Sequence, residues 1–188
     1  MVSEPATPSL VEVGPEVVLT GDAGFDAYVR RHGPRFSRTA FLLTGDHHLA
    51  EDLVQAALAK TALRWDRVVA RGDPAPYVRT VIVRTAIAWR RRRWLGEVPT
   101  SPLPETSDSE HGIAVDRREQ LRRALLGIPA RQRAAVVLRF YEDLSVADAA
   151  RVMGCSSGTV KSQTAKGLAR LRGLLEDGSI PAEEENEG

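Results

Sequence analysis

The sequence has one cysteine, few aromatic residues and no long apolar run. Cys155 cannot form an internal disulfide and has no Cys or His neighbour at metal-ligand spacing, which suits a reducing compartment. No window approaches about 18 consecutive apolar residues, and the N-terminus lacks the basic and apolar blocks of a signal peptide. We therefore expect a cytoplasmic protein without membrane insertion.

Arrangements typical of catalysis are missing as well. The histidines are not spaced as metal ligands, there is no phosphate-binding glycine loop, and no serine lies in a nucleophile elbow. The sequence thus predicts a protein that is not an enzyme and that carries neither a metal nor a cofactor.

The small net charge of +1 hides a separation of sign along the chain. Residues 22–95 hold 14 Lys and Arg against 7 Asp and Glu, and residues 116–175 hold 12 against 5. Each segment is therefore +7, while 13 of the 25 acids lie in the connecting and terminal segments. Basic bodies attract polyanions and gain affinity by releasing counterions from a nucleic-acid backbone. The pattern points towards DNA or RNA.

The segments outside the two basic bodies are rich in proline or acids. Residues 1–21 contain three prolines, residues 96–115 contain three more among Ser, Thr, Asp and Glu, and residues 176–188 contain six acids and no base. We expect a disordered N-terminal tail at 1–21, a flexible linker at 96–115 and a solvated acidic tail at 176–188. Two small domains, 22–95 and 116–175, remain.

Both basic bodies show helical spacing, and no segment alternates convincingly as a strand. In residues 22–95, apolar residues recur at steps of three, four and seven. This spacing predicts three helices: one from Phe25 to Leu43, one capped by Asp46 and running to Trp65, and one from Pro76 into Arg90–Arg93. In residues 116–175 we expect a helix stopped by Pro129 and another with Phe140 and Tyr141 on its apolar side. The fold class is all-α.

Residues 144–162 have the pattern of a helix-turn-helix. Ser145, with Asp148 three residues on, predicts an N-terminal cap, Gly154 permits a tight turn, and Ser156 is placed to cap the second helix. Within the second helix, Ser162, Ala165, Lys166 and Ala169 face away from the apolar side. Because small residues let a helix approach DNA and lysines reach phosphates or guanine acceptors, this face suits a major groove.

These motifs resemble those of a known family. Residues 144–171 resemble the promoter-reading domain of extracytoplasmic-function (ECF) sigma factors of the sigma-70 family, particularly through GTVKS at 158–162 and LARLR at 168–172. The resemblance extends to the actinobacterial sigma-E-like subgroup.

The first body resembles the same family. AEDLVQ at 50–55 resembles the sigma-2 signature, and residues 77–79 with 87–93 resemble the DNA-opening helix. Two different motifs in the family's order are a specific signal. The resemblance implies two helical domains, sigma-2-like and sigma-4-like, joined by a linker.

The resemblance also implies site residues and partners. It implies polymerase contacts by Asp52, Leu53, Val54 and Gln55, although the spacing of Leu53 and Val54 is that of core residues. Contacts with the minus-35 element are expected from Ser156, Ser157, Thr159, Lys161, Ser162, Gln163 and Lys166. Contacts with the minus-10 element and phosphates are expected from Arg79, Arg84, Trp89, Arg90, Arg91, Arg92 and Arg93. The implied partners are the clamp helices and flap of core RNA polymerase, and promoter DNA. Whether an anti-sigma factor also binds is not decided by the sequence.

Some positions keep two interpretations. The family commonly has Asn where this chain has Arg84, and Arg where it has Lys166, whose point charge lacks the guanidinium fork. Trp89 lies on an apolar stripe, where an aromatic is usually core, but it could stack on an unpaired base.

The function indicated is a sigma factor that directs core polymerase to promoters and opens the minus-10 element. The alternatives are a stand-alone helix-turn-helix regulator and, more weakly, an RNA-binding regulator.

Overall fold

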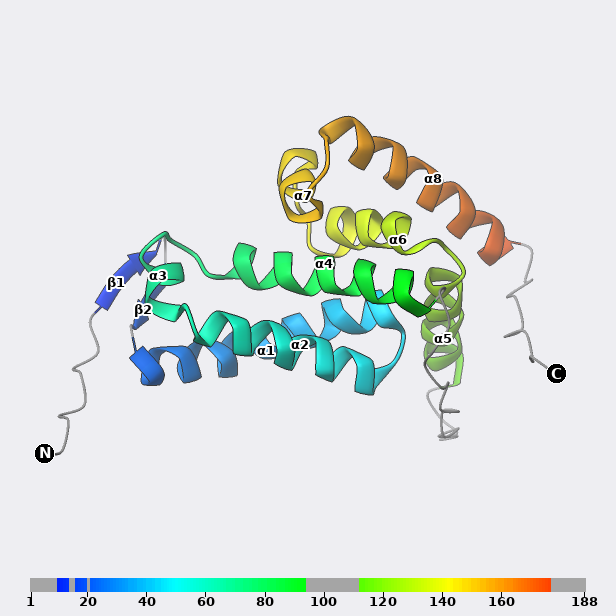
Figure 1. Ribbon diagram of the computed structural model, residues 1–188. Coiled ribbons are helices and arrows are strands. Elements are labelled where there is room, and N and C mark those ends of the chain that lie inside the picture. Colours follow the sequence, from blue (N-terminus) through cyan, green and yellow to red (C-terminus); the bar gives the residue numbers. More distant parts are fainter. Residues whose placement is uncertain (1–9, 14–15, 20, 94–111, 177–188) are drawn as a thin grey trace, which may run out of the picture.

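The computed structural model describes residues 10–13, 16–19, 21–93 and 112–176 (Figure 1). Two helical bundles lie against one another. The N-terminal bundle consists of α1 Gly21–Thr44, α2 His47–Ala62, α3 Trp65–Val69 and α4 Ala75–Arg93. The C-terminal bundle consists of α5 Gly112–Leu126, α6 Ala130–Val136, the π-helical η1 Val137–Tyr141, α7 Val146–Met153 and α8 Ser157–Glu176. The expected all-α class with two small helical domains is confirmed.

The turn between α1 and α2 forms as its sequence predicts. Gly45 adopts a φ of 74°, a left-handed conformation that glycine takes without strain. The Asp46 carboxylate then accepts a hydrogen bond from the Leu49 amide at 2.8 Å and so caps α2. Two long helices can therefore pack side by side.

The predicted helix running to Trp65 is interrupted, which corrects our expectation. Helix α2 ends at Ala62, and Arg64 has φ −137° and ψ 17°, outside helical values. The break turns the Trp65 indole inward, where its ring centroid lies 5.3 Å from that of Phe25 and 5.1 Å from that of Tyr28. Burial of a large aromatic against two others outweighs continuation of a single helix.

The N-terminal segment predicted to be disordered contains a hairpin. Strands β1 Leu10–Val13 and β2 Glu16–Leu19 pair antiparallel, with Leu10 opposite Leu19 and Val13 opposite Glu16. Valines recur in both strands, and β-branched residues prefer extended backbone, so composition alone misled the prediction. The hairpin is an addition to the all-α architecture.

The expected linker is shorter than predicted at its C-terminal side, because α5 already begins at Gly112. Residues 94–111 lie outside the described residues, as does the acidic segment 177–188.

A π-helical turn alters the apolar face that we expected near residue 140. Along η1 the Glu142 amide donates to the Val137 carbonyl five residues earlier, at 3.0 Å. The extra residue in this turn rotates the next side chains about the helix axis, because the α-helical period is lost. Phe140 and Tyr141, predicted on the apolar side, are consequently 63% and 40% exposed, whereas Glu142 is 3% exposed. The placement predicted for the two aromatics was wrong.

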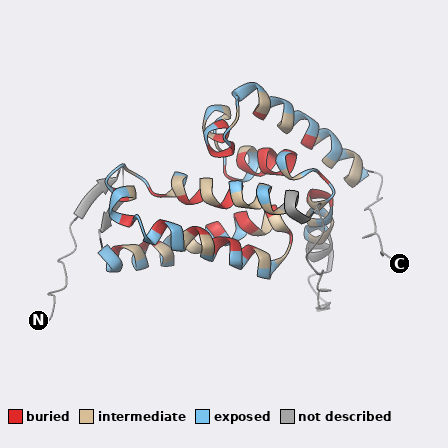
Figure 2. Cartoon of the chain, in the orientation of Figure 1, coloured by how far each residue is buried: buried red, intermediate tan, exposed pale blue. Residues whose placement is uncertain are grey.

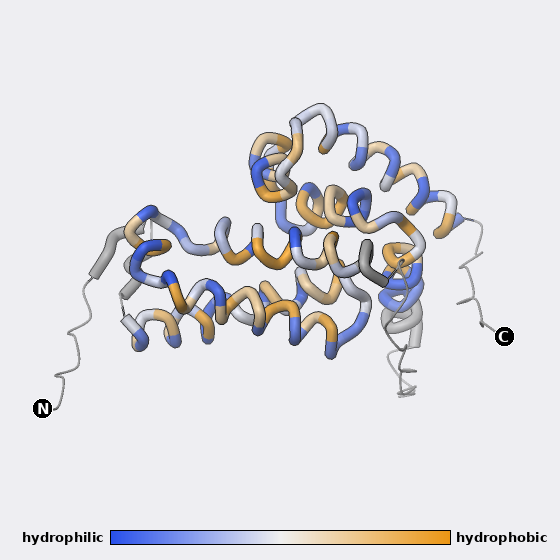
Figure 3. The backbone as a smooth tube through the Cα atoms, in the orientation of Figure 1, coloured by the Kyte–Doolittle hydropathy of each residue, from blue (hydrophilic) through white to orange (hydrophobic). Residues whose placement is uncertain are grey.

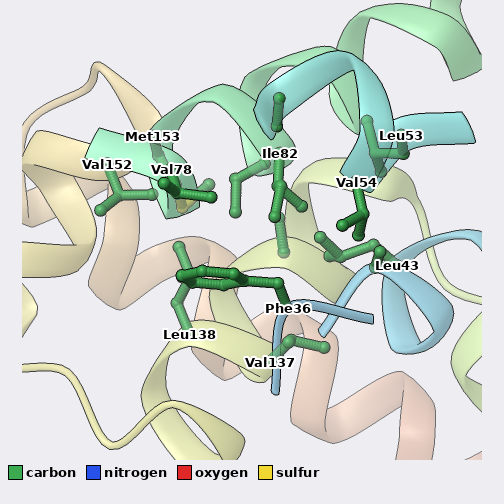
Figure 4. Close-up of a cluster of buried hydrophobic side chains, with 14 of the residues drawn as sticks. Phe36, Leu43, Leu53, Val54, Val78, Ile82, Val137, Leu138, Val152 and Met153 are labelled. Atoms are coloured by element: carbon green, nitrogen blue, oxygen red, sulfur yellow. The ribbon is translucent and has the colours of Figure 1, made fainter. Parts of the chain in front are cut away.

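The two bundles share one hydrophobic core (Figure 2). Figure 4 shows Phe36 of α1 next to Val137 and Leu138 of the C-terminal bundle, with Val152 and Met153 of α7 close to Val78 of α4. Figure 3 shows apolar residues recurring in α1, α2 and α4, while hydrophilic residues gather on α5 and recur along α8. Because apolar burial holds the bundles together, the arrangement differs from a loose pair of domains.

Two glycines of α8 give a test of the packing. A Cβ at Gly167 would lie 2.8 Å from the Val136 Cγ2 atom and 3.2 Å from the Gln132 carbonyl oxygen, whereas a Cβ at Gly173 would meet nothing within 4 Å. We expect Gly167→Ala to lower the free energy of unfolding by about 1 to 3 kcal/mol through overpacking. Gly173→Ala, the control, should raise it by roughly 0.5 to 1 kcal/mol through helix propensity. Urea unfolding of the full chain measures both, and changes of the same sign would contradict the close approach of α8 to α6.

Candidate nucleic-acid interface

The first helix of the helix-turn-helix, α7, has a capping residue at each end. The Ser145 hydroxyl accepts a hydrogen bond from the Asp148 amide at 3.0 Å, and Gly154 ends α7 with a φ of 65°. The hydrogen bond from the Ser145 hydroxyl, helped by the nearby Arg151 guanidinium, holds the pKa of the Asp148 carboxyl below its usual value. The predicted cap and turn are confirmed.

Helix α8 begins with the second predicted cap. The Ser156 hydroxyl oxygen accepts from the Thr159 amide at 3.1 Å and shares a 2.9 Å hydrogen bond with the Thr159 hydroxyl. Capping leaves the amide end of α8 ordered, and the positive end of its dipole favours a nearby phosphate.

The outer face of α8 is open. Val160 and Gly167 are buried against the bundle, while Ala165 and Ala169 are exposed on the other side. Of the residues expected at the minus-35 element, Thr159 and Gln163 are half-buried, and the exposed ones are Ser156, Ser157, Lys161, Ser162 and Lys166. The helix therefore presents small side chains flanked by two lysines, a surface that a DNA major groove can accommodate.

The signature on α2 divides into two faces. Asp52 and Gln55 are exposed, and the Gln55 amide donates to Glu51 at 3.4 Å. Leu53 and Val54 are buried at 0% and 6% exposure. The expectation that Leu53 and Val54 touch polymerase is thus corrected, because their side chains fill the core beneath the exposed pair.

Two arginines of α4 that we expected to contact DNA are engaged by the C-terminal bundle. The Arg79 side chain is 9% exposed, and its Nε lies 3.0 Å from the Glu142 Oε2 atom. Arg84 donates from Nε to the Val152 carbonyl and from a terminal nitrogen to the Arg151 carbonyl, both at 3.0 Å. In this arrangement the Arg79 guanidinium is buried by the C-terminal bundle, whereas Arg84 is held by two carbonyls of that bundle but stays exposed.

The remaining candidates on α4 lie towards its C-terminal end. Trp89 is half-buried and packs against the shared core, which agrees with its interpretation as a core residue. Arg90, Arg91, Arg92 and Arg93 belong to α4, but their side chains lie outside the described residues.

Sequence reasoning missed the contact made by Glu142. Its carboxylate also accepts from the Thr39 hydroxyl and lies 3.0 Å from an Arg35 nitrogen. Thr39 is 103 residues away and Arg79 is 63 residues away, so no local pattern links them. The one signal in the sequence was that Glu142 directly follows the mostly apolar residues 136–141, within a segment of net positive charge.

A second polar contact joins the bundles just past the C-terminal end of α1. Arg122 of α5 donates to the Gly45 carbonyl at 2.9 Å, and a Cβ at Gly45 would meet the Leu126 side chain. Hydrogen bonds from Arg122, with Arg123 adding to them, lower the pKa of Glu119 to about 2. Glu119 thus stays ionised and orients Arg122 towards the N-terminal bundle.

Each bundle matches a known protein domain. The N-terminal part matches sigma-70 region 2 over residues 28–95, and the C-terminal part matches sigma-70 region 4 over residues 118–171. An RNA polymerase sigma-E factor of Streptomyces avermitilis is 38% identical over 84% of this chain and 88% of its own length. The ECF RNA polymerase sigma factor SigM of Mycobacterium tuberculosis is 33% identical over 84% of this chain and 80% of its own length.

The chain belongs to the sigma-70 family.

Solved structures share the fold of this sigma factor. The sigma factor RpoE, in complex with the anti-sigma factor NepR from Bartonella quintana, matches with a TM-score of 0.65 and 23% identity, over 82% of this chain and 98% of its own. CnrH, in complex with the cytosolic domain of CnrY, matches with a TM-score of 0.59 and 19% identity, over 85% and 92%. Among the described residues of the sigma factor, no helix is long and apolar enough to cross a membrane.

The family confirms the function indicated by the sequence. This sigma factor is a non-enzymatic, DNA-binding transcription initiation factor, and its ECF-type relatives agree with the predicted group. The alternative of a stand-alone helix-turn-helix regulator is not favoured, because a region 2 domain precedes the helix-turn-helix.

Proposed function

We propose that this sigma factor acts in the cytoplasm, where residues 22–95 dock on core RNA polymerase and open the minus-10 element while residues 116–175 read the minus-35 element. The observation that carries the proposal is the presence of both bundles in one chain, each with an exposed polar face. A regulator that only bound duplex DNA would need the C-terminal bundle alone. The segment 96–115 then connects the two activities.

The proposed polymerase contact is the exposed pair on α2. Asp52 offers a carboxylate and Gln55 an amide from a helix held by Leu53 and Val54 beneath it. We assign this pair to the clamp helices and the C-terminal bundle to the flap. Such a contact is rigidly placed, because its side chains come from adjacent turns of one buried helix.

The proposed DNA contacts divide by position. On α8, Lys166 and the small residues around it face outward and should meet base edges, whereas Lys161, nearer the helix start, should meet a phosphate. The other proposed minus-35 contacts are Ser156, Ser157, Thr159, Ser162 and Gln163. On α4 we propose Arg79, Arg84, Trp89 and Arg90–Arg93 for the minus-10 element and its phosphates.

A further partner is proposed on the strength of the solved relatives. RpoE and CnrH are both bound to a second protein, and the one bound to RpoE is an anti-sigma factor. We assign an anti-sigma factor to this chain as well.

Core polymerase tests the proposed function. The immobilised full chain should retain purified core RNA polymerase, and the two together should initiate at specific promoters in a purified system. Binding of promoter duplex without retention of polymerase would instead identify a stand-alone regulator.

The α2 contact predicts a local effect of charge reversal. Asp52→Lys should weaken retention of core polymerase at least tenfold, because an exposed carboxylate at the contact is replaced by a cation. Asp26→Lys makes the same charge change at an exposed position of α1 and should leave retention unchanged. Equal losses for the two variants would remove Asp52 from the contact.

Two lysines of α8 should differ in what they contribute. Lys166→Ala is expected to cost about 1 to 3 kcal/mol on the correct minus-35 element and to relax preference at one base pair, most simply a guanine. Lys161→Ala should weaken binding similarly on all sequences and reduce the salt slope by about one unit, as loss of a phosphate contact does. Titration against single-base promoter changes at two salt concentrations separates the roles. If Lys166→Ala lowers affinity equally for every sequence, the residue does not read bases.

A further inference from the structure

Glu142 is an acid placed where two cations and a hydroxyl converge. Its side chain is 0% exposed, and both carboxylate oxygens are bound. Oε2 lies 3.0 Å from an Arg35 nitrogen and 3.0 Å from the Arg79 Nε, while Oε1 accepts from the Thr39 hydroxyl. All three partners belong to the N-terminal bundle.

These three partners form an anion cradle that we define as Arg35, Thr39 and Arg79. Guanidinium and hydroxyl donors are the groups that commonly bind phosphate oxygens. The Arg35 side chain is still 55% exposed with Glu142 in place, so one wall of the cradle already faces solvent. Among the described residues, the ion pairs of Arg35 and Arg79 are both with Glu142. If Glu142 moved away, the two guanidinium groups would therefore lose this counter-charge.

Long-range repulsion between like charges opposes the packing of the two bundles against one another, which we call the closed arrangement. Residues 22–95 and residues 116–175 are each +7, so the two bundles repel one another. Only five acids lie in residues 116–175, and Glu142 is the one in the cradle. Arg84 also donates to the carbonyls at the C-terminal end of α7, which carry the partial negative charge of the helix dipole. Besides the shared apolar core, the contact therefore includes a local anionic partner, Glu142, that a polyanion can replace.

We propose that Glu142 occupies the place of a DNA backbone phosphate, and that the cradle of Arg35, Thr39 and Arg79 binds such a phosphate when the two bundles separate. The free chain is then closed against DNA at α4, and DNA competes with Glu142 for the same donors. This inference rests on DNA being the partner of the chain, as proposed above.

The test uses the full chain and a fluorescent single-stranded oligothymidylate, because phosphate contacts do not depend on sequence. Glu142→Gln keeps the shape of the side chain and removes its charge. Asp143→Asn is the matched control, since Asp143 is adjacent and exposed, and its φ of 53° is one that asparagine accepts. Both variants raise the net charge by one.

Glu142→Gln should bind the oligonucleotide at least tenfold more tightly than the unmodified chain, and Asp143→Asn should not. The salt slope of Glu142→Gln should steepen by about 0.7, the value for one additional phosphate contact on a single strand. Adding Arg79→Gln or Arg35→Gln to Glu142→Gln should remove most of the gain, because each deletes a wall of the cradle.

A second variant opens the interface without touching the cradle. Leu126→Ser weakens the contact with Gly45, just past the C-terminal end of α1, and it should also raise oligonucleotide affinity, again dependent on Arg79. If circular dichroism shows that Glu142→Gln is unfolded, the test uses Leu126→Ser in its place.

Three results overturn the inference: an equal gain in Asp143→Asn, a gain that survives loss of both arginines, or no gain in any folded opening variant. Promoter-specific transcription by the unmodified chain with core polymerase is measured in parallel. If the unmodified chain supports transcription but no opening variant binds the oligonucleotide more tightly, only the cradle hypothesis is refuted. If the unmodified chain supports no transcription, the proposed function is refuted.

Discussion

The buried Glu142 carboxylate is the contact on which the arrangement of the two bundles depends. Two arginines and a hydroxyl of the N-terminal bundle bind it, and its own position is set by the π-helical turn that directs residue 142 inward. Removing one partner of a buried ion pair typically costs about 3 to 5 kcal/mol, because the remaining charge stays desolvated and unpaired. The shared apolar core around Phe36 and Leu138 adds stability without direction, whereas the ion pair fixes how the bundles meet.

This arrangement affects the two proposed DNA surfaces differently. The outer face of α8 is exposed while the bundles are together, so the minus-35 reader is accessible. On α4 the C-terminal bundle buries Arg79 and also binds Arg84, which stays exposed. If the cradle binds a phosphate as proposed, Arg79 becomes available to DNA only when Glu142 moves away, so contacts by α8 and by Arg79 would not begin together. A ligand drives such a change only through its stronger binding to the open state.

Local signals explain why much of the fold could be predicted. The caps at Asp46, Ser145 and Ser156 and the left-handed Gly154 each involve residues within a few positions of one another, so the sequence contains the whole interaction. The exposed lysines of α8 were predictable from helical spacing in the same way. The position of Glu142 could not be predicted, because its partners lie 63 and 103 residues away and a π-helical turn breaks the period that spacing assumes. Extended valine-rich strands at 10–13 and 16–19 were hidden by surrounding prolines and polar residues.

If Glu142 holds the two bundles together in the free chain, binding to core polymerase should separate them. Energy transfer between one dye at Asp26→Cys on α1 and another at Arg172→Cys on α8, in a Cys155→Ser background, reports the separation directly, since both labelled positions are exposed. We expect high transfer in the free chain and a large drop when core polymerase is added, because the two bundles are proposed to dock on different parts of the enzyme, the clamp helices and the flap. Transfer that stays unchanged in a transcribing complex would contradict the account.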